Sequence, residues 1–184
     1  MRAFIAIELD PEIKDVLVAL VRDLRRTGAA VRWVEPAGMH LTLKFLGEID
    51  EDQAHRVKET LTRIAPRHPS FGIELAGTGA FPGETSPRVL WVGFAAAPEL
   101  AALQSDLEAA LEADGFDREE RDFKPHLTLG RVKGPDRLAQ AVGELIKHRD
   151  KSFGSMTVRK ITLFESLLRP EGAIYRKVFE AELP

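Results

Sequence analysis

The chain has 184 residues, a formal net charge of −3, 44% hydrophobic residues and 30% charged residues. These values are ordinary for a soluble globular protein of one domain, and they argue against a general nucleic-acid coat, so nucleic-acid contact would need a local basic patch. The absence of cysteine excludes a disulfide framework, a thiolate zinc site and a cysteine nucleophile. Neither a signal peptide nor an apolar run near the ~20 residues of a membrane span occurs, so we expect a cytoplasmic protein without membrane contact.

In chain order, apolar periodicity and turn residues predict about eight strands and four helices. The strands are expected at 2–9, 31–36, 40–47, 71–77, 88–94, 126–132, 156–166 and 173–183, and the helices at 11–27, 50–65, 98–115 and 135–149. Residues 78–87, TGAFPGETSP, are predicted to form a loop. The order is not a strict alternation of strand and helix, and neighbouring strands have an antiparallel pattern, which indicates an α+β fold.

The tetrapeptide HLTL occurs at 40–43 and again at 126–129, so the two histidines are 86 residues apart, close to half the chain. Because side chains alternate along a strand, the histidine and threonine of each copy share one face and the leucines share the other. In the first copy, Phe45 is expected on the leucine face. The spacing indicates a duplicated lobe. If the two halves pack about a pseudo-twofold axis, the two His-Thr pairs face each other across a cleft.

Two opposed imidazoles suit the cleavage of a phosphoester without a metal. One ring can accept a proton while the other donates one, and threonine hydroxyls can hold phosphate oxygens. A single histidine at the start of a strand is more often structural than catalytic, but two copies in the same phase favour one shared site. The remaining histidines, His55, His68 and His148, lack such a context and are predicted to lie on the surface.

Several other side chains are candidates for binding a substrate. Arg131 would suit a phosphate, yet strict alternation puts it on the leucine face, so it reaches the cleft only if the strand bulges at Gly130. Lys44 falls on the histidine face of the first copy, and Lys124 lies close to the second copy. Phe81, in the loop rich in glycine and proline, is a candidate for stacking on a base.

Signatures of other chemistries are missing. The sequence contains no phosphate-binding loop, no dinucleotide-binding glycine motif, no serine nucleophile elbow and no pair of histidines at metal-ligand spacing. We therefore expect neither a cofactor nor a metal. Two alternatives stay open: a nucleotide- or RNA-binding module without turnover, and a phosphodiesterase for small cyclic nucleotides or ADP-ribose cyclic phosphate.

Taken together, the two motifs and their flanks resemble the 2H phosphoesterase superfamily, which is named for two H-x-[ST] motifs. The similarity is carried by MHLTLKFLGEI at 39–49 and KPHLTLGRV at 124–132, supported by RAFIAIEL at 2–9, ITLFESLL at 161–168 and Tyr175. Within the superfamily the chain looks most like the RNA 2′,3′-cyclic phosphodiesterases, also called 2′-5′ RNA ligases, over essentially its whole length.

This resemblance implies that the chain opens RNA 2′,3′-cyclic phosphate ends to 2′-phosphates without a metal, with a weaker reverse activity that joins RNA ends through a 2′-5′ bond. By position, His40 and His126 correspond to the catalytic pair, and Thr42, Thr128 and Arg131 to the phosphate-binding residues. We expect His40 to protonate the leaving O3′ and His126 to activate water.

The resemblance also implies a bilobal α+β fold with pseudo-twofold symmetry, in which two antiparallel sheets line a central cleft and the helices lie outside. Residues 1–184 are expected to form one domain of two intertwined lobes, and we expect a monomer. Its expected partners are RNA molecules that end in a 2′,3′-cyclic phosphate, tRNA fragments among them, or cyclic nucleotides.

Overall fold

Nine strands and four α-helices make up the computed structural model, which describes residues 1–184. The strands are β1 (Arg2–Glu8), β2 (Val31–Trp33), β3 (His40–Glu48), β4 (Phe71–Phe81), β5 (Val89–Phe94), β6 (His126–Val132), β7 (Ser152–Val158), β8 (Lys160–Arg169) and β9 (Gly172–Glu182). The helices are α1 (Pro11–Arg25), α2 (Glu51–Ile64), α3 (Pro98–Ala113) and α4 (Leu138–Ile146). No helix combines the length and apolar composition that a membrane span requires.

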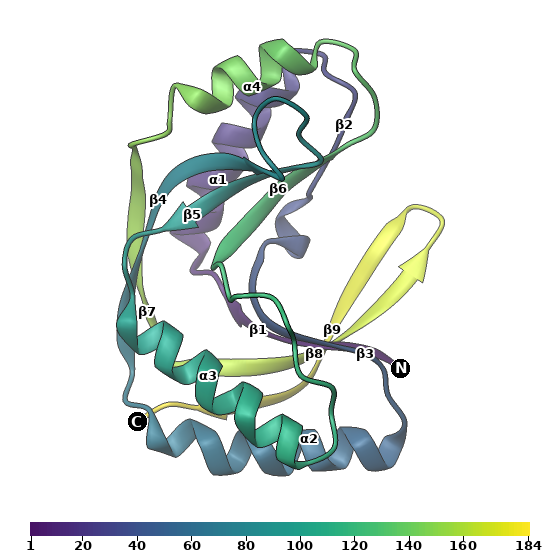
Figure 1. Cartoon of the computed structure of the whole chain (residues 1–184), viewed down its shortest axis with the longest axis vertical. Coiled ribbons are helices and arrows are strands. Elements are labelled where there is room, and N and C mark those ends of the chain that lie inside the picture. The colour runs from purple at the N-terminus through teal and green to yellow at the C-terminus, as the bar shows by residue number, and fades with distance from the viewer.

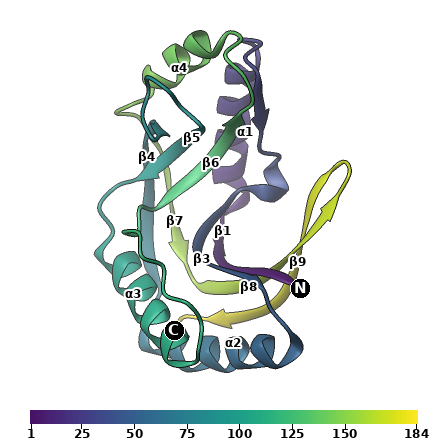
Figure 2. The same cartoon turned by 45° about the vertical axis from the view of Figure 1, so that its right-hand side comes forward.

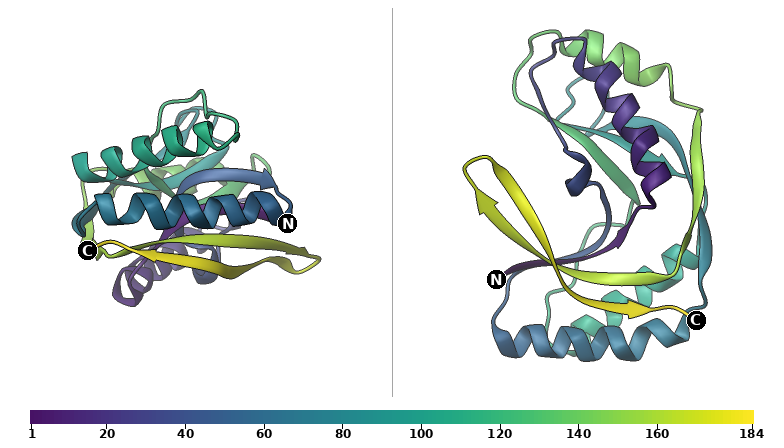
Figure 3. Two further views of the ribbon diagram at one scale, coloured as in Figure 1. Left: turned by 90° about the horizontal axis from the view of Figure 1, so that it is seen from below. Right: turned by 180° about the vertical axis from the view of Figure 1, so that it is seen from behind.

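The strands form two antiparallel sheets, one of four strands in the order β3-β1-β8-β9 and one of five in the order β2-β6-β5-β4-β7. The chain is C-shaped, with the sheets on the inside and the helices on the outside (Figure 1). Helices α2 and α3 run side by side under the four-stranded sheet, and α1 and α4 cover the five-stranded sheet (Figure 3). This arrangement confirms the expected α+β fold of two antiparallel sheets with outer helices.

The helices pack on the sheets because each has one apolar stripe. In α1, Ile13, Leu17, Leu20 and Leu24 recur at helical spacing, and all four are buried. One continuous core of 40 buried residues contains side chains from both sheets and all four helices. The two lobes therefore share a single hydrophobic core.

Each half of the chain contributes strands to both sheets. The first half forms β1 and β3 of the four-stranded sheet, but its β4 pairs with β5 in the other sheet. The second half forms β5 and β6, but its β8 returns to pair with β1. Helix α1 packs on β7, and α3 packs on β3, so the helices are exchanged in the same way.

Two of the predicted elements were wrong. Strand β4 continues through Phe81, so the loop expected at 78–87 is confined to residues between β4 and β5. The segment 156–166 is not one strand: β7 ends at Val158, β8 begins at Lys160, and the two strands lie in different sheets. Both errors have one cause, since periodicity in the sequence does not show which sheet a strand joins.

Candidate active site

The two HLTL segments form β3 and the start of β6, and both have the predicted phase. Leu41 and Leu43 are buried, as are Leu127 and Leu129, whereas the histidines and threonines between them are only partly buried. In each sheet the leucines contribute to the shared core under the helices. The inner face of each sheet therefore carries one His-x-Thr pair.

Each of these strands has a β-bulge at the residue that follows the threonine. In β3, Thr42 pairs with Ala6 and Lys44 with Ile5, which leaves Leu43 without a partner. In β6, Thr128 pairs with Trp91 and Gly130 with Leu90, which leaves Leu129 without a partner. A bulge inserts one extra residue and so shifts the phase of the side chains that follow it. The symmetry between the half-sites therefore extends to this backbone irregularity.

The bulges decide where the residues after the motifs lie. Arg131 is exposed on the His126 face of β6, as binding a phosphate would require, and the bulge stands at Leu129 rather than at Gly130. At the corresponding position of β3, Phe45 is 72% exposed and lies near Phe4 on the inner face. The prediction that Phe45 packs on the leucine face was wrong, because the bulge reverses the alternation.

Lys44 was also predicted wrongly, since it does not lie on the inner face. Its side chain is buried and forms an ion pair with Glu108 of α3. Lys44 Nζ also donates to the carbonyl of Asp117 at 2.6 Å, and Glu108 Oε1 accepts from the backbone N–H of Glu119 at 2.7 Å. The pair thus ties β3 and α3 to the segment that leads towards β6.

His126 is oriented by the backbone just before its own strand. One ring nitrogen, Nδ1, lies 2.7 Å from the carbonyl oxygen of Lys124, and since a carbonyl can only accept, Nδ1 donates. The other nitrogen, Nε2, is then available for proton transfer. The ring of Phe81 stands edge-on to the imidazole, with 4.9 Å between the ring centroids.

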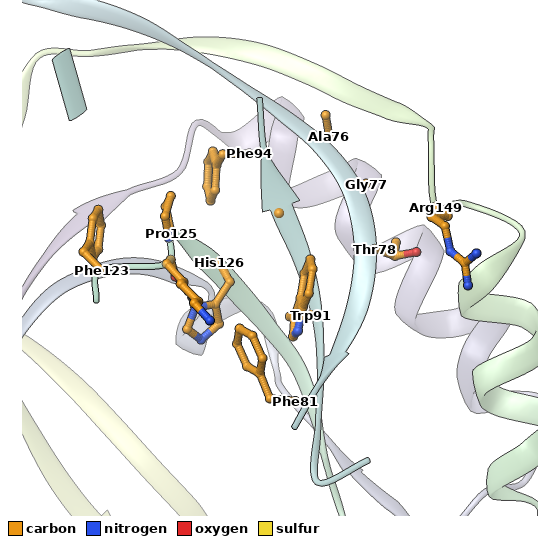
Figure 4. A pocket seen from close by; sticks show the side chains of 12 residues that line it. Ala76, Gly77, Thr78, Phe81, Trp91, Phe94, Phe123, Pro125, His126 and Arg149 are labelled. Atoms are coloured by element: carbon orange, nitrogen blue, oxygen red, sulfur yellow. The ribbon is translucent and has the colours of Figure 1, made fainter. Parts of the chain in front are cut away.

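An open pocket of about 410 Å³ adjoins His126. Its walls are largely aromatic, as Figure 4 shows, and Phe81, Trp91, Phe94, Phe123 and Lys124 all contribute. The structure thus brings two of the predicted substrate-binding residues, Phe81 and Lys124, to His126. No pattern in the sequence indicated Phe94 and Phe123, whose role depends on the pairing of β4, β5 and β6.

His40 has a different environment, because aromatic rings enclose it. The ring centroids of Phe164, Tyr175 and Phe4 lie 4.6, 5.1 and 5.7 Å from that of the imidazole. Burial, helped by the positive charge of Lys14 and opposed by the carboxylate of Glu8, lowers the pKa of His40 to about 4. His40 is therefore neutral at pH 7.

The rings beside the two histidines also correspond between the half-sites. Phe164 pairs with Phe4, which pairs with Phe45. Phe81 pairs with Val89, which pairs with Arg131. Phe164 and Phe81 thus hold equivalent places in their sheets, and each contacts the histidine of its own half-site.

Sequence reasoning missed one cation beside the predicted phosphate clamp. Arg32 of β2 pairs directly with Arg131 of β6, so both side chains lie on the same face of the sheet. The guanidinium of Arg32 lies close to the turn between β8 and β9. A Cβ built on Gly172 in this turn would lie 3.7 Å from Arg32 Nη2. This hairpin projects beyond the rest of its sheet (Figure 2).

The other histidines lie away from these strands. His55 is exposed as predicted, whereas His68 and His148 are each only partly exposed. The side chain of His68 is 16% exposed, and its Nε2 is 2.9 Å from a carboxylate oxygen of Asp106. No group of three or more His, Cys, Asp or Glu side chains is arranged to hold a metal ion.

Comparison with known proteins shows which family the chain belongs to. Residues 13–169 match the family described as the 2′-5′ RNA ligase superfamily. The chain belongs to the 2′-5′ RNA ligase superfamily. A relative from Archaeoglobus fulgidus, named RNA 2′,3′-cyclic phosphodiesterase, is 39% identical over 183 residues and aligns with 98% of this chain and 100% of its own length. A relative of the same name from Methanothermobacter thermautotrophicus is 38% identical over 178 residues, with 95% of each chain covered.

Two solved crystal structures share the fold. The protein TT0787 of Thermus thermophilus has a TM-score of 0.82 at 31% identity, with 100% of this chain and 98% of that chain covered. E. coli LigT complexed with 3′-AMP has a TM-score of 0.78 at 26% identity, with 99% and 97% covered. The correspondence spans both lobes, and therefore both half-sites.

Proposed function

We propose that this member of the superfamily is an RNA 2′,3′-cyclic phosphodiesterase that opens the terminal cyclic phosphate to a 2′-phosphate with two histidines. The observation that carries the proposal is the equivalent placement of His40 and His126, each on the inner face of its sheet and each followed by a threonine and a bulge. The names of the relatives from Archaeoglobus fulgidus and Methanothermobacter thermautotrophicus support the substrate class.

We keep the order of roles expected from the sequence. Because the Nδ1–H of His126 donates to the Lys124 carbonyl, Nε2 of the neutral ring has a free lone pair and can accept the proton of water. The lowered pKa of His40 makes its imidazolium a strong acid, which gives its proton to O3′ after the anionic phosphate has bound beside it. We therefore assign His126 to water and His40 to O3′.

In the reaction, a water molecule attacks phosphorus opposite O3′. The water oxygen forms a bond to phosphorus and its proton passes to His126. The bond between phosphorus and O3′ breaks, and O3′ takes the proton from His40. Phosphorus keeps its bond to O2′, so the product is a 2′-phosphate with a free 3′-hydroxyl.

The phosphate needs donors for its non-bridging oxygens, where negative charge gathers during attack. Thr42 and Thr128 share the inner faces with the histidines, and Arg131 follows on the face of His126. Hydroxyl and guanidinium donors fixed before the reaction stabilise that charge without reorganisation. We assign these three side chains to the phosphate.

Ligation uses the same geometry. A 5′-hydroxyl of a second RNA takes the place of water and gives its proton to His126. O3′ departs with a proton from His40, which leaves a 2′-5′ linkage. Hydrolysis dominates where water is the more abundant nucleophile.

Product analysis tests the proposed reaction. An oligonucleotide that ends in a 2′,3′-cyclic phosphate is incubated with the protein in EDTA, and the ends are identified by mass spectrometry and by phosphatase sensitivity. We expect a 2′-phosphate from the wild type and from His55→Ala, and loss of activity by roughly 10²- to 10⁴-fold in His40→Ala and in His126→Ala. Full activity in both of the latter variants, with folding intact, would refute the mechanism.

A modified substrate tests the order of roles. Sulfur in place of O3′ makes a leaving group that departs as a thiolate and needs no acid, since thiols ionise far more readily than alcohols. We expect the 3′-thio cyclic phosphate to restore hydrolysis to His40→Ala but not to His126→Ala. Restoration of His126→Ala instead would give His126 the role of acid.

A substrate panel tests the remaining predictions about partners. RNA ends, tRNA fragments with cyclic ends and free nucleoside cyclic phosphates are compared by kcat/KM. Binding of all three without turnover would identify a binding module, and preference for free nucleotides would identify a small-molecule phosphodiesterase. Action as a monomer and a cytoplasmic location stay predictions.

A further inference from the structure

The two sheets differ by one strand at the edge that carries the His-x-Thr motif. In the four-stranded sheet, β3 with His40 is itself the edge strand. In the five-stranded sheet, β6 with His126 has a further neighbour, β2. The order β3-β1-β8-β9 corresponds to β6-β5-β4-β7, so β2 has no counterpart in the lobe of His40. A side chain of β2 on the inner face is therefore an addition to the second half-site alone.

Strand β2 packs closely on β6, and this packing directs Arg32 inward. A Cβ built on Gly130 of β6 would come within 2.5 Å of Val31 and 2.8 Å of Trp33, so only glycine admits these two side chains. Both of them pack against the hydrophobic core. Because side chains alternate along a strand, Arg32 between them lies on the inner face, as does its cross-strand partner Arg131.

Arg32 and Arg131 place two cations side by side without a carboxylate to compensate them. Both side chains are exposed, and neither forms an ion pair. Arg25, Arg63 and Arg149, in contrast, each have a carboxylate partner. Like charges directly opposite each other on neighbouring strands repel. An anion bound beside both guanidinium groups would offset this repulsion, so the pair favours a ligand with negative charge at this place.

The guanidinium of Arg32 lies where the two lobes approach each other. Its Nη2 would be 3.7 Å from a Cβ built on Gly172, in the turn between β8 and β9. That turn belongs to the four-stranded sheet, whereas β2 belongs to the other. Across the sheet, Arg32 is one strand further than Arg131 from β5. A group bound by Arg32 is therefore next to the phosphate assigned to Arg131, but distinct from it.

We propose that Arg32 binds the phosphodiester on the 5′ side of the terminal nucleotide, and so makes the protein select RNA ends over free nucleoside cyclic phosphates. The inference rests on the proposed function, in which Arg131 holds the reacting phosphate. In an RNA chain the next negative charge lies on the phosphodiester that joins the terminal ribose to the rest of the strand. A free nucleoside 2′,3′-cyclic phosphate has no charge there. The planar fork of Arg32 suits two oxygens of such a group.

The first half-site offers no such contact. Phe45, an uncharged ring, holds the place in β3 that Arg131 holds in β6. Lys44 is the only cation of β3, and it is buried in its ion pair with Glu108. No strand lies beyond β3 to supply another cation. The 5′ phosphodiester therefore finds an unpaired cation on the side of β2 and none on the side of β3.

The test uses two substrates that differ only in the phosphodiester. Uridine 2′,3′-cyclic phosphate is compared with its 5′-(methyl phosphate), which carries the phosphodiester without a second nucleoside. In Arg32→Met we expect kcat/KM for the 5′-(methyl phosphate) to fall roughly 5- to 50-fold, as for a charged hydrogen bond that solvent partly screens. For uridine 2′,3′-cyclic phosphate, kcat/KM should stay within about two-fold of the wild-type value, because this substrate has no group for Arg32 to bind.

Two further variants serve as controls. Arg32→Lys keeps the charge but not the fork of donors, so its loss should be smaller than that of Arg32→Met. Arg22→Met removes an exposed arginine without an ion pair from helix α1, and it should leave both kcat/KM values unchanged. A general defect of folding in Arg32→Met would lower both kcat/KM values together, whereas loss of the contact changes their ratio.

Binding of RNA gives a second measurement that does not depend on turnover. The Kd of an RNA of about ten nucleotides that ends in a 2′-phosphate is measured by fluorescence anisotropy between about 50 and 200 mM salt. Each phosphate of a single strand that the protein neutralises contributes about 0.7 to the slope of log Kd against log salt. Arg32→Met should reduce this slope by about 0.7, while Arg22→Met should keep the wild-type slope.

The outcomes separate the contact from the reaction. If Arg32→Met hydrolyses the two substrates in the wild-type ratio and binds RNA with the wild-type salt slope, the contact is overturned while the hydrolase stands. If the wild type hydrolyses no cyclic phosphate but the slope still falls in Arg32→Met, the proposed function is overturned while the contact with the RNA backbone stands.

Discussion

Lys44 and Glu108 form a buried ion pair between β3 and α3, with 6% and 10% of their side chains exposed. Removing one member of such a pair leaves an uncompensated charge in the interior, which costs about 3–5 kcal/mol. We predict that Lys44→Met lowers the free energy of unfolding by an amount in that range, measured by urea denaturation. The double variant Lys44→Met with Glu108→Leu should recover much of the loss, because both charges are then absent.

An exposed ion pair serves as the control. Lys160 and Glu180 are 2.6 Å apart, with 39% and 36% of their side chains exposed. Lys160→Met should change the free energy of unfolding by no more than about 1 kcal/mol, since solvent screens such pairs. If Lys160→Met lowered the free energy of unfolding as much as Lys44→Met, burial of the Lys44–Glu108 pair would not explain the larger loss.

The stability of the protein should depend on pH through His40. Its pKa is about 4 in the folded chain against an ordinary value of 6.5, so between these values the unfolded chain binds more protons. This contribution to stability is complete above pH 6.5 and is lost as pH falls towards 4. We predict that urea midpoints fall further between about pH 7 and pH 4.5 in the wild type than in His40→Asn, which cannot titrate. Equal losses in the two proteins would contradict the lowered pKa.

Gly79 should not tolerate even the smallest side chain. A Cβ would come within 2.3 Å of the Trp91 indole, so Gly79→Ala must displace the ring, and overpacking of this kind costs about 1–3 kcal/mol. Gly83→Ala is the matched control, because a Cβ there would meet no atom within 4 Å. We expect a lower thermal midpoint in Gly79→Ala and an unchanged midpoint in Gly83→Ala. Wild-type behaviour of both variants would show that Trp91 can move at no cost.

Arg131 should contribute to phosphate binding through its fork of donors. Hydrogen bonds to a charged group contribute about 1.5–3 kcal/mol, so kcat/KM of Arg131→Met should fall roughly 10- to 150-fold. Arg131→Lys should recover only part of the loss, because an ammonium cannot make the two parallel bonds. Arg159→Met, in the exposed link between β7 and β8, should leave kcat/KM unchanged. Unchanged kcat/KM in Arg131→Met would remove this residue from the site.

Much of the half-sites was accessible from the sequence, because alternation is a local property. The burial of Leu41 and Leu43, and of Leu127 and Leu129, follows from the side-chain period of a strand. The same period places each histidine with its threonine on the opposite face. Repetition of the pattern in both halves of the chain was enough to indicate a shared site and an α+β fold.

Beyond the threonines, strict alternation no longer predicts which face a side chain joins. The bulges at Leu43 and Leu129 are set by how β3 pairs with β1 and β6 with β5, and no residue in either strand indicates where they fall. They moved Lys44 into the core and Phe45 onto the inner face. Arg131 reached its predicted face only because its strand has the same irregularity.

The sequence by itself determined that two His-x-Thr strands exist and which of their faces are polar, since these properties depend only on the order of residues. The tertiary structure alone decided what surrounds each histidine. His40 is enclosed by rings from β1, β8 and β9, and His126 faces a pocket built from β4, β5 and the segment before β6. Those contacts join residues far apart in the chain, so they arise only when the sheets assemble, and it is their asymmetry that distinguishes the two histidines.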